Sequence, residues 1–209
     1  DTTRFWFEVT DKAGTFSVYG KDPNARLTSY VPHVFALPRH PPAYDVGQWF
    51  LERVVDANEN LTEHVYQHDD RGSALSGIYA EDFRQVYLAD VYYTGRAGRT
   101  ATSVPTRGPY HVHFAHRASP RGDVATSGRL GFKVMSRKLL SSILVEFKED
   151  RIREYALEYG IGDFGKSRLE RLRVKGAEGT QFYEHRFGYT RKEVPDSRGA
   201  VAAFAPVTG

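Results

Sequence analysis

The sequence predicts an all-β protein in which antiparallel strands follow one another as hairpins. Tyr and Phe each occur 13 times in 209 residues, whereas Met occurs once, and aromatic residues favour strands. Short apolar runs recur along the chain with turn residues between them. No stretch indicates a helix more clearly than strands. Because consecutive strands joined by short turns pair side by side, antiparallel pairing is expected.

The first expected element is a hairpin made of FWFEVT (5–10) and TFSVYG (15–20). Gly14 lies in the turn between them and adopts a positive φ at little cost. Residues 21–48 are rich in proline, which donates no hydrogen bond to a sheet. We therefore expect a long irregular connection near 21–48. Its apolar members indicate that it packs onto the protein; they are Tyr30, Val34, Phe35 and Leu37.

The remaining chain predicts strands near 49–55, 61–68, 86–95, 110–117, 152–160, 168–176 and 181–190. Polar, glycine-containing loops separate several of them, including 118–128. Residues 130–147 fit either a helix or two strands that bend at Ser141 and Ser142, and we favour the strands. Alternation in 152–160 predicts a strand with one buried face: Tyr155, Leu157 and Tyr159 point one way, and Glu154 and Glu158 the other.

Composition excludes several classes of protein. The absence of cysteine excludes disulfides and thiol chemistry, and no apolar run reaches the roughly 18–20 residues of a membrane span. The net charge of +3 comes from interspersed acidic and basic residues. We expect a single β-rich domain over 1–190, with 191–209 as a linker or tail. The chain begins at Asp1 and not at Met, which predicts a segment of a longer polypeptide.

One hairpin pattern occurs twice, at Trp49–Asp70 and at Ser167–Thr190. Apolar residues begin the first strand, a polar turn reverses the chain, and aromatic residues end the second strand. In the first copy Leu51 and Val54 precede the turn and Tyr66 ends the unit; the second copy uses Leu169, Leu172, Phe187 and Tyr189. Because an isolated hairpin is marginally stable in water, such units must stack edge to edge.

This unit resembles the Rhs/YD repeat, a leucine-containing strand, an Asp and Gly-Asn turn, and a strand with Tyr. Five segments in order resemble the N-terminal region of SpvB and TcB-like toxin proteins: FEVTDKAGTFSVYG, WFLERVVDANENLTEHVY, YLADVYYTGR, GFKVMSRKLLSSILVEF and IREYALEYGIGDFGKSRLERLRVKG. In the turn D-A-N-E-N, Ala57 stands where Pro is usual and Glu59 where Gly is usual. We therefore expect Asn58 or Asn60 to adopt the left-handed conformation there.

The resemblance implies a curved Rhs/YD-like sheet; a β-sandwich is the alternative. It also implies a non-catalytic structural segment of a secreted bacterial toxin, within a β-sheet shell that encapsulates or delivers a toxic C-terminal polypeptide. Its partners would be other segments of the same toxin or toxin-complex subunits, and no cofactor is implied. No nucleophile elbow or phosphate-binding loop occurs in the sequence, so we expect no enzymatic activity.

The alternative function is a free-standing β-sandwich that binds carbohydrate. Exposed loop aromatics would stack on the sugar rings of a glycan; the candidates are Tyr30, Phe35, Tyr44 and Trp49.

Two groups of side chains are candidate metal sites. His111 and His113 share one strand face and are candidate metal ligands, although no carboxylate stands at a fixed spacing from them. Four carboxylates flank one loop and are a weaker candidate for calcium: Asp69, Asp70, Glu81 and Asp82.

Two further patterns have simpler explanations than binding. The last hairpin is basic, but Glu170 interrupts it and the whole chain is nearly balanced, so we expect a solvated face and no nucleic-acid binding; its basic residues are Lys166, Arg168, Arg171, Arg173 and Lys175. The triplet Arg121-Gly122-Asp123 matches an integrin-recognition motif, but such triplets arise often by chance.

Overall fold

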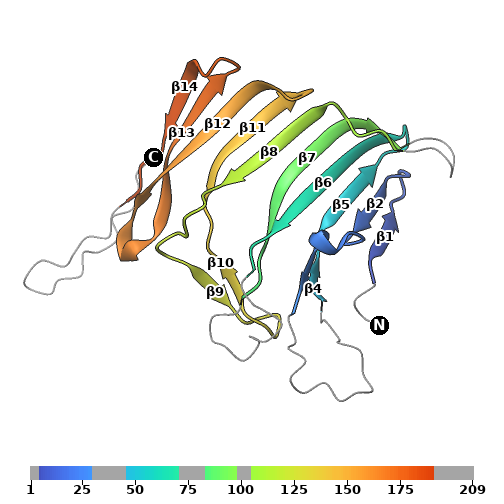
Figure 1. Ribbon diagram of the computed structural model, residues 1–209, viewed down its shortest axis with the longest axis horizontal. Helices are drawn as coiled ribbons and strands as arrows, with labels where there is room; N and C mark the ends of the chain where they lie inside the picture. Colours follow the sequence, from blue (N-terminus) through green and yellow to red (C-terminus); the bar gives the residue numbers. More distant parts are fainter. Residues whose placement is uncertain (1–4, 30–45, 71–82, 98–104, 191–209) are drawn as a thin grey trace, which may run out of the picture.

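In the computed structural model, described over residues 5–29, 46–70, 83–97 and 105–190, ten antiparallel strands form one curved sheet (Figure 1). Their order across the sheet follows their order in the chain: β1 (Phe7–Thr10), β2 (Phe16–Tyr19), β5 (Leu51–Val55), β6 (Asn60–His68), β7 (Val86–Arg96), β8 (Tyr110–His116), β11 (Leu140–Phe147), β12 (Asp150–Ile161), β13 (Ser167–Gly176) and β14 (Gln181–Arg186). No α-helix occurs in these ranges. The prediction of an all-β protein built from sequential hairpins is confirmed. Of the two predicted architectures, the structure has the curved sheet and not the β-sandwich.

Two small strand pairs, missed by the sequence analysis, interrupt the succession of hairpins. β3 (Arg26–Thr28) pairs with β4 (Val46–Trp49), and β9 (Ala125–Ser127) pairs with β10 (Val134–Ser136). The connection predicted to be irregular over 21–48 therefore contains regular structure at both ends; its central residues, with Tyr30, Val34, Phe35 and Leu37, lie outside the described ranges.

Short 3-10 helices complete the regular elements. η2 (Pro23–Ala25) begins at a proline, which has no backbone N–H to leave unpaired at a helix start. The carboxylate of Asp22 caps it by accepting a hydrogen bond from the Asn24 N–H at 2.8 Å. η4 (Asp163–Gly165) lies between β12 and β13.

Residues 130–147 form strands, and the helical alternative is wrong. The chain leaves regular structure between β10 and β11, at 137–139, and not at Ser141 and Ser142. Ser141 instead lies in a β-bulge between β11 and β8, where its hydroxyl donates to the carbonyl of Ala115 at 2.9 Å. The division of the chain into 1–190 and 191–209 stays a prediction, since the tail lies outside the described residues.

The hairpin turns at 11–15 and 56–60 share one geometry. In each, the Asp Oδ1 accepts the backbone N–H groups two and four residues later, at 2.8 and 2.9 Å. The fourth residue of each turn is left-handed: Gly14 has φ +84° and Glu59 has φ +64°. The expectation that Asn58 or Asn60 would adopt this conformation is wrong. The Asp56 carboxylate accepts hydrogen bonds from the N–H groups of both asparagines, and Glu59, which lies between them, adopts the left-handed conformation.

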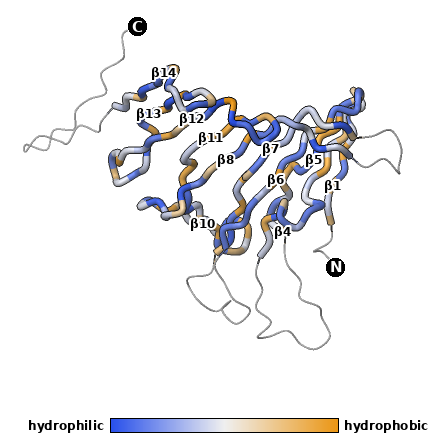
Figure 2. Tube along the Cα trace, turned by 45° about the horizontal axis from the view of Figure 1, so that its top comes forward, coloured by the Kyte–Doolittle hydropathy of each residue, from blue (hydrophilic) through white to orange (hydrophobic). Residues whose placement is uncertain are grey.

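The register separates the middle of the sheet into two unlike faces. We define the apolar face by rows of cross-strand partners on β7, β8 and β11 to β14: Val91, Tyr93, Tyr110, Val112, Phe114, Ile143, Val145, Phe147, Tyr155, Leu157, Leu172, Val174 and Tyr183. The polar face carries mainly polar side chains, with Val65 and Leu144 as apolar exceptions: Glu63, Asp90, Tyr92, His111, His113, Glu146, Glu154, Arg173, Lys175 and Glu184. The apolar face has Arg153 and His185 as polar exceptions. Hydrophobic and hydrophilic residues accordingly intersperse along the strands (Figure 2).

The buried apolar side chains concentrate in the half of the sheet that includes β2, β6 and β7; among the described residues they are Val18, Ala25, Leu27, Leu61, Phe83, Val86, Ala89 and Val174. Most of these lie on or beside η2, β3 and the start of β7. On the apolar face, Val174 alone is fully buried and the other side chains stay half-buried or exposed. Among the described elements, the two small strand pairs lie beyond one end of the main strands (Figure 1), so neither forms a second layer over this face.

Candidate functional site

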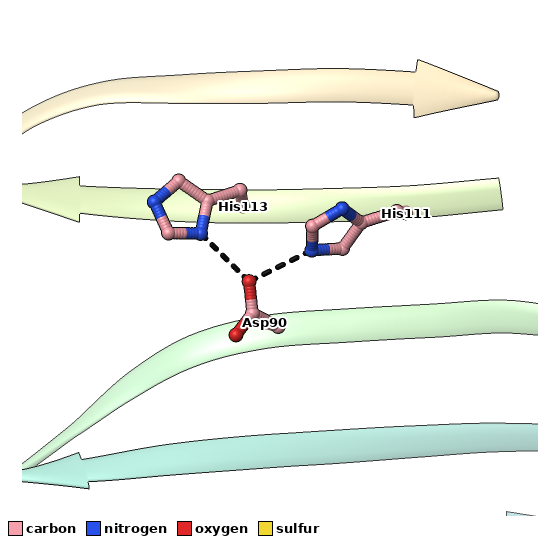
Figure 3. A group of neighbouring side chains, drawn as sticks. All are labelled: Asp90, His111 and His113. Atoms are coloured by element: carbon pink, nitrogen blue, oxygen red, sulfur yellow. Dashed lines mark hydrogen bonds and ion pairs between the residues drawn. The ribbon is translucent and has the colours of Figure 1, made fainter. Parts of the chain in front are cut away.

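Three side chains of types that can ligate metals meet on the polar face at the centre of the sheet (Figure 3). His111 and His113 come from β8, and Asp90 comes from the neighbouring strand β7. Asp90 Oδ1 lies 2.7 Å from His111 Nε2 and 2.7 Å from His113 Nδ1. The alternation along one strand predicts that the two histidines share a face, but Asp90 was not predicted from the sequence. The available signal was a single carboxylate within the otherwise apolar run YLADVYY.

Two more side chains hold the His111 ring in place. Glu146, on β11, lies with its Oε2 2.8 Å from His111 Nδ1. The ring of Tyr92 stacks on the imidazole with centroids 4.4 Å apart and planes 3° apart. His111 is therefore held at both nitrogen atoms and on one ring face. The His113 side chain is more open, with 39% exposure against 19% for His111 and Asp90.

The carbohydrate hypothesis expected Trp49 in an exposed loop, but the structure places it in a strand. It ends β4, and its indole Nε1 donates to the carbonyl of Phe5 at 2.8 Å. The ring of Phe7 packs edge-on against it at 5.1 Å. Gly20 leaves room for the indole, since a Cβ there would lie 2.6 Å from Trp49 Cδ1. Trp49 thus holds the first strand in place; Tyr30, Phe35 and Tyr44 lie outside the described residues.

The two described carboxylates of the candidate calcium site, Asp69 and Asp70, form ion pairs. Asp69 is buried and its carboxylate faces the guanidinium of Arg137, at 3.1 Å from Oδ1 to Nη2. Asp70 pairs with Arg84 and with His68, and its hydrogen bond raises the pKa of His68 above the ordinary value. Basic side chains therefore already pair with the carboxylates of Asp69 and Asp70. Glu81 and Asp82 lie outside the described ranges.

Four basic residues of the last hairpin face carboxylates: Arg168, Arg171, Arg173 and Lys175. Arg173 lies 2.7 Å from Glu158 and 3.0 Å from Glu184, and Lys175 lies 3.4 Å from Glu154. Arg168 pairs with Glu170 at 3.4 Å and Arg171 with Glu158 at 3.9 Å. This alternation of signs supports the expected solvated face, because a nucleic-acid surface requires uncompensated positive charge.

Comparison with solved structures decides the fold. The chain superimposes on a crystal structure of TcdB2-TccC3 with a TM-score of 0.62 and 16% identity, over 85% of this chain and 10% of that chain. It superimposes on the N-terminal domain of the effector SpvB from Salmonella typhimurium strain LT2 with a TM-score of 0.60 and 16% identity, over 82% of this chain and 61% of that one. The chain has the SpvB and TcB fold. A Tc holotoxin pore from Photorhabdus luminescens matches similarly, at 0.60 and 16%, over 85% of this chain and 10% of that chain.

The SpvB-like fold was recognisable from the ordered motifs. No protein-family model matches the sequence, and a search of curated proteins found no match. The chain spans about a tenth of the two Tc toxin chains and 61% of the SpvB domain. Among the described residues, no helix is long and apolar enough to cross a lipid bilayer.

Both copies of the recurring hairpin in this SpvB-like fold close in the same way. The Tyr66 hydroxyl donates to the carbonyl of Leu51 at 2.7 Å, and the Tyr189 hydroxyl donates to the carbonyl of Leu169 at 2.7 Å. The prediction that the final aromatic residue packs back over the hairpin is thereby confirmed and given a polar contact. Burial raises the pKa of Tyr66 to about 12.

The Arg121-Gly122-Asp123 triplet is structural in this SpvB-like fold. Arg121 donates twice to the Asp123 carboxylate, at 2.7 and 2.8 Å. The N–H and the hydroxyl of Ser167, at the start of β13, donate to the same carboxylate. The Asp123 side chain is only 5% exposed, so the triplet does not present its carboxylate for integrin recognition.

Asp123→Asn is expected to weaken the dependence of stability on acid pH. The hydrogen bonds from Arg121, then those from Ser167, hold the pKa of Asp123 well below its ordinary value of 3.8. Since the folded state favours the ionised form, this stabilisation is complete above pH 3.8 and is lost as the pH falls further. Urea midpoints of both proteins at decreasing pH measure it. Ser167→Ala should give an intermediate slope, and equal slopes for wild type and Asp123→Asn would contradict the assignment.

Proposed function

We propose that this chain is a non-catalytic structural segment of a secreted bacterial toxin of the SpvB and TcB kind. It forms part of the wall of a β-sheet shell that encapsulates or delivers a toxic C-terminal polypeptide. Its partners are other segments of the same polypeptide or other subunits of a toxin complex. The observation that carries the proposal is the uncovered apolar face of a single-layer sheet.

A single sheet with one apolar face does not complete a folded domain. Stable domains bury such a face against a second layer. Here Tyr93 stacks on Tyr110 with ring centroids 5.2 Å apart, and Phe147 lies tilted against Tyr110 at 4.9 Å; all three stay half-buried on the apolar face. Half-exposed aromatic and aliphatic rows of this extent fit the wall of a larger assembly better than a free surface.

The two outer strands give a second argument. Within the described chain, β1 and β14 each pair on one side only and lie at opposite ends of the sheet (Figure 1). Both expose apolar side chains, with Phe7 and Val9 at 51% and 50% and Phe182 at 61%. Isolated proteins usually protect such edges with charge, proline or a covering segment. In a larger shell, neighbouring segments of the toxin would cover both edges.

Amide hydrogen exchange of this chain, alone and within the longer toxin polypeptide, tests the proposal. We expect the outward-facing amides of β1 and β14 to exchange rapidly in the isolated chain and slowly in the toxin. The central strands β7 and β8, paired on both sides, serve as the internal control and should be protected in both samples. Edge strands that exchange equally fast in both samples would contradict a place within a continuous wall.

A further inference from the structure

We propose that Asp90, His111 and His113 form a binding site for a divalent transition-metal ion of the zinc, nickel and copper class. The proposal rests on the geometry of these side chains and does not depend on the shell function. Nε2 of His111, Nδ1 of His113 and a carboxylate oxygen of Asp90 all lie within 4.8 Å of one another. Two imidazoles and one carboxylate are the ligand set of many three-residue zinc sites, which leave a fourth position to water.

The sheet holds the ligands on a rigid frame. His113 lies directly opposite Asp90 in the register of β7 and β8, and His111 lies two residues away on the same face. The Cα atoms at such positions cannot separate without breaking the strand pairing. Zinc–nitrogen bonds of about 2.0–2.1 Å require the two imidazoles to close slightly around an ion. The Asp90 oxygen now lies between the two nitrogen atoms, so it would turn aside on its own side-chain bonds to coordinate the ion.

The surroundings of His111 favour a ligand over a simple hydrogen-bonded histidine. With Nδ1–H donated to Glu146 at 2.8 Å, Nε2 is the nitrogen that would bind a metal, and the ion would replace its present 2.7 Å contact with Asp90 Oδ1. A carboxylate behind a ligating histidine is the usual outer partner in zinc sites, because it fixes the ring and raises its basicity. Tyr92, stacked on the same ring, removes the remaining rotation.

The chemistry of the ligands determines which ions bind. Imidazole nitrogen suits zinc, nickel and copper, whereas calcium and magnesium prefer sites made entirely of oxygen ligands. The 39% exposure of the His113 side chain leaves an approach from solvent for the ion and for a coordinated water. A bound ion would join β7 to β8, whose connection includes residues outside the described ranges, and would replace hydrogen bonds with shorter and stronger coordination bonds.

Isothermal titration of the 209-residue chain with zinc chloride tests the proposal, with magnesium chloride as the comparison ion. We expect one zinc ion to bind per chain, and no heat from magnesium. His111→Ala, His113→Ala and Asp90→Asn should abolish the binding heat. Glu146→Gln, which changes only the outer partner, should weaken zinc binding by about 10- to 100-fold. His185→Ala, an exposed histidine on β14, is the matched control and should bind zinc as wild type does.

Histidine side-chain NMR signals of the wild-type protein give a second readout that does not depend on any variant folding. Addition of zinc should shift the signals of His111 and His113 and leave that of His185 in place. Absence of heat and of shifts with zinc would overturn the proposal. Unaltered zinc binding in folded His111→Ala and Asp90→Asn variants would also overturn it, because the ion would then bind elsewhere.

Discussion

Leu61→Ala is expected to lower the free energy of unfolding by about 3 kcal/mol, the usual cost of deleting a well-packed buried leucine side chain. Leu61 is 1% exposed and is one of the two largest fully buried side chains in the described residues. It lies opposite Gly95 in the register of β6 and β7, where a Cβ on Gly95 would come within 3.3 Å of Leu61 Cβ. The sheet is thus packed closely at this point and cannot readily collapse into the cavity that the substitution would leave.

Urea unfolding followed by circular dichroism measures this loss. Ile161→Ala is the matched control, because it also removes aliphatic carbon but from a side chain that is 80% exposed. We expect the control to change stability by less than about 0.5 kcal/mol. Similar losses in the two variants would show that Leu61 does not belong to a packed core.

Asp69→Ala is expected to cost about 3 kcal/mol, the lower end of the range for breaking a buried ion pair. The Asp69 side chain is 8% exposed and faces Arg137 twice, at 3.1 and 3.3 Å, with Lys138 at 3.6 Å. The lower end applies because the Arg137 side chain is 26% exposed and water can partly compensate it. This contact ties the end of β6 to the chain between β10 and β11.

A double-mutant cycle with Arg137→Ala separates the pair from other effects of either substitution. We expect the double variant to lose less stability than the two single variants together, by about 1–3 kcal/mol, since the pair is lost only once. Arg137 also stacks on Phe83 at 4.3 Å, so its single variant carries a further loss that does not involve Asp69. Strictly additive losses would contradict a direct interaction between the two residues.

The strands of the main sheet could be predicted because their signals are local. Alternating polarity marks β12, and Asp11 and Gly14 mark the first turn; both features operate over a few residues. β3, β4, β9 and β10 could not be predicted in this way. They are three or four residues long and pair outside the main sheet, so no repeating pattern has room to develop.

The residues of the candidate site differ in the same way, since two could be predicted from local sequence and two could not. His111 and His113 share a face because side chains alternate along one strand, which the sequence alone establishes. Asp90 and Glu146 join them only through the register of β8 with β7 and β11, which is set by pairings between distant parts of the chain.

The sequence by itself determined the all-β class, the succession of hairpins and the aromatic residue that closes each recurring unit. Those properties follow from local periodicity and turn chemistry. Only the tertiary structure decided that Trp49 ends a strand and holds the carbonyl of Phe5, and that Asp90 lies beside both histidines. Each of these depends on which strands lie side by side, and that pairing depends on burial and register across the whole sheet.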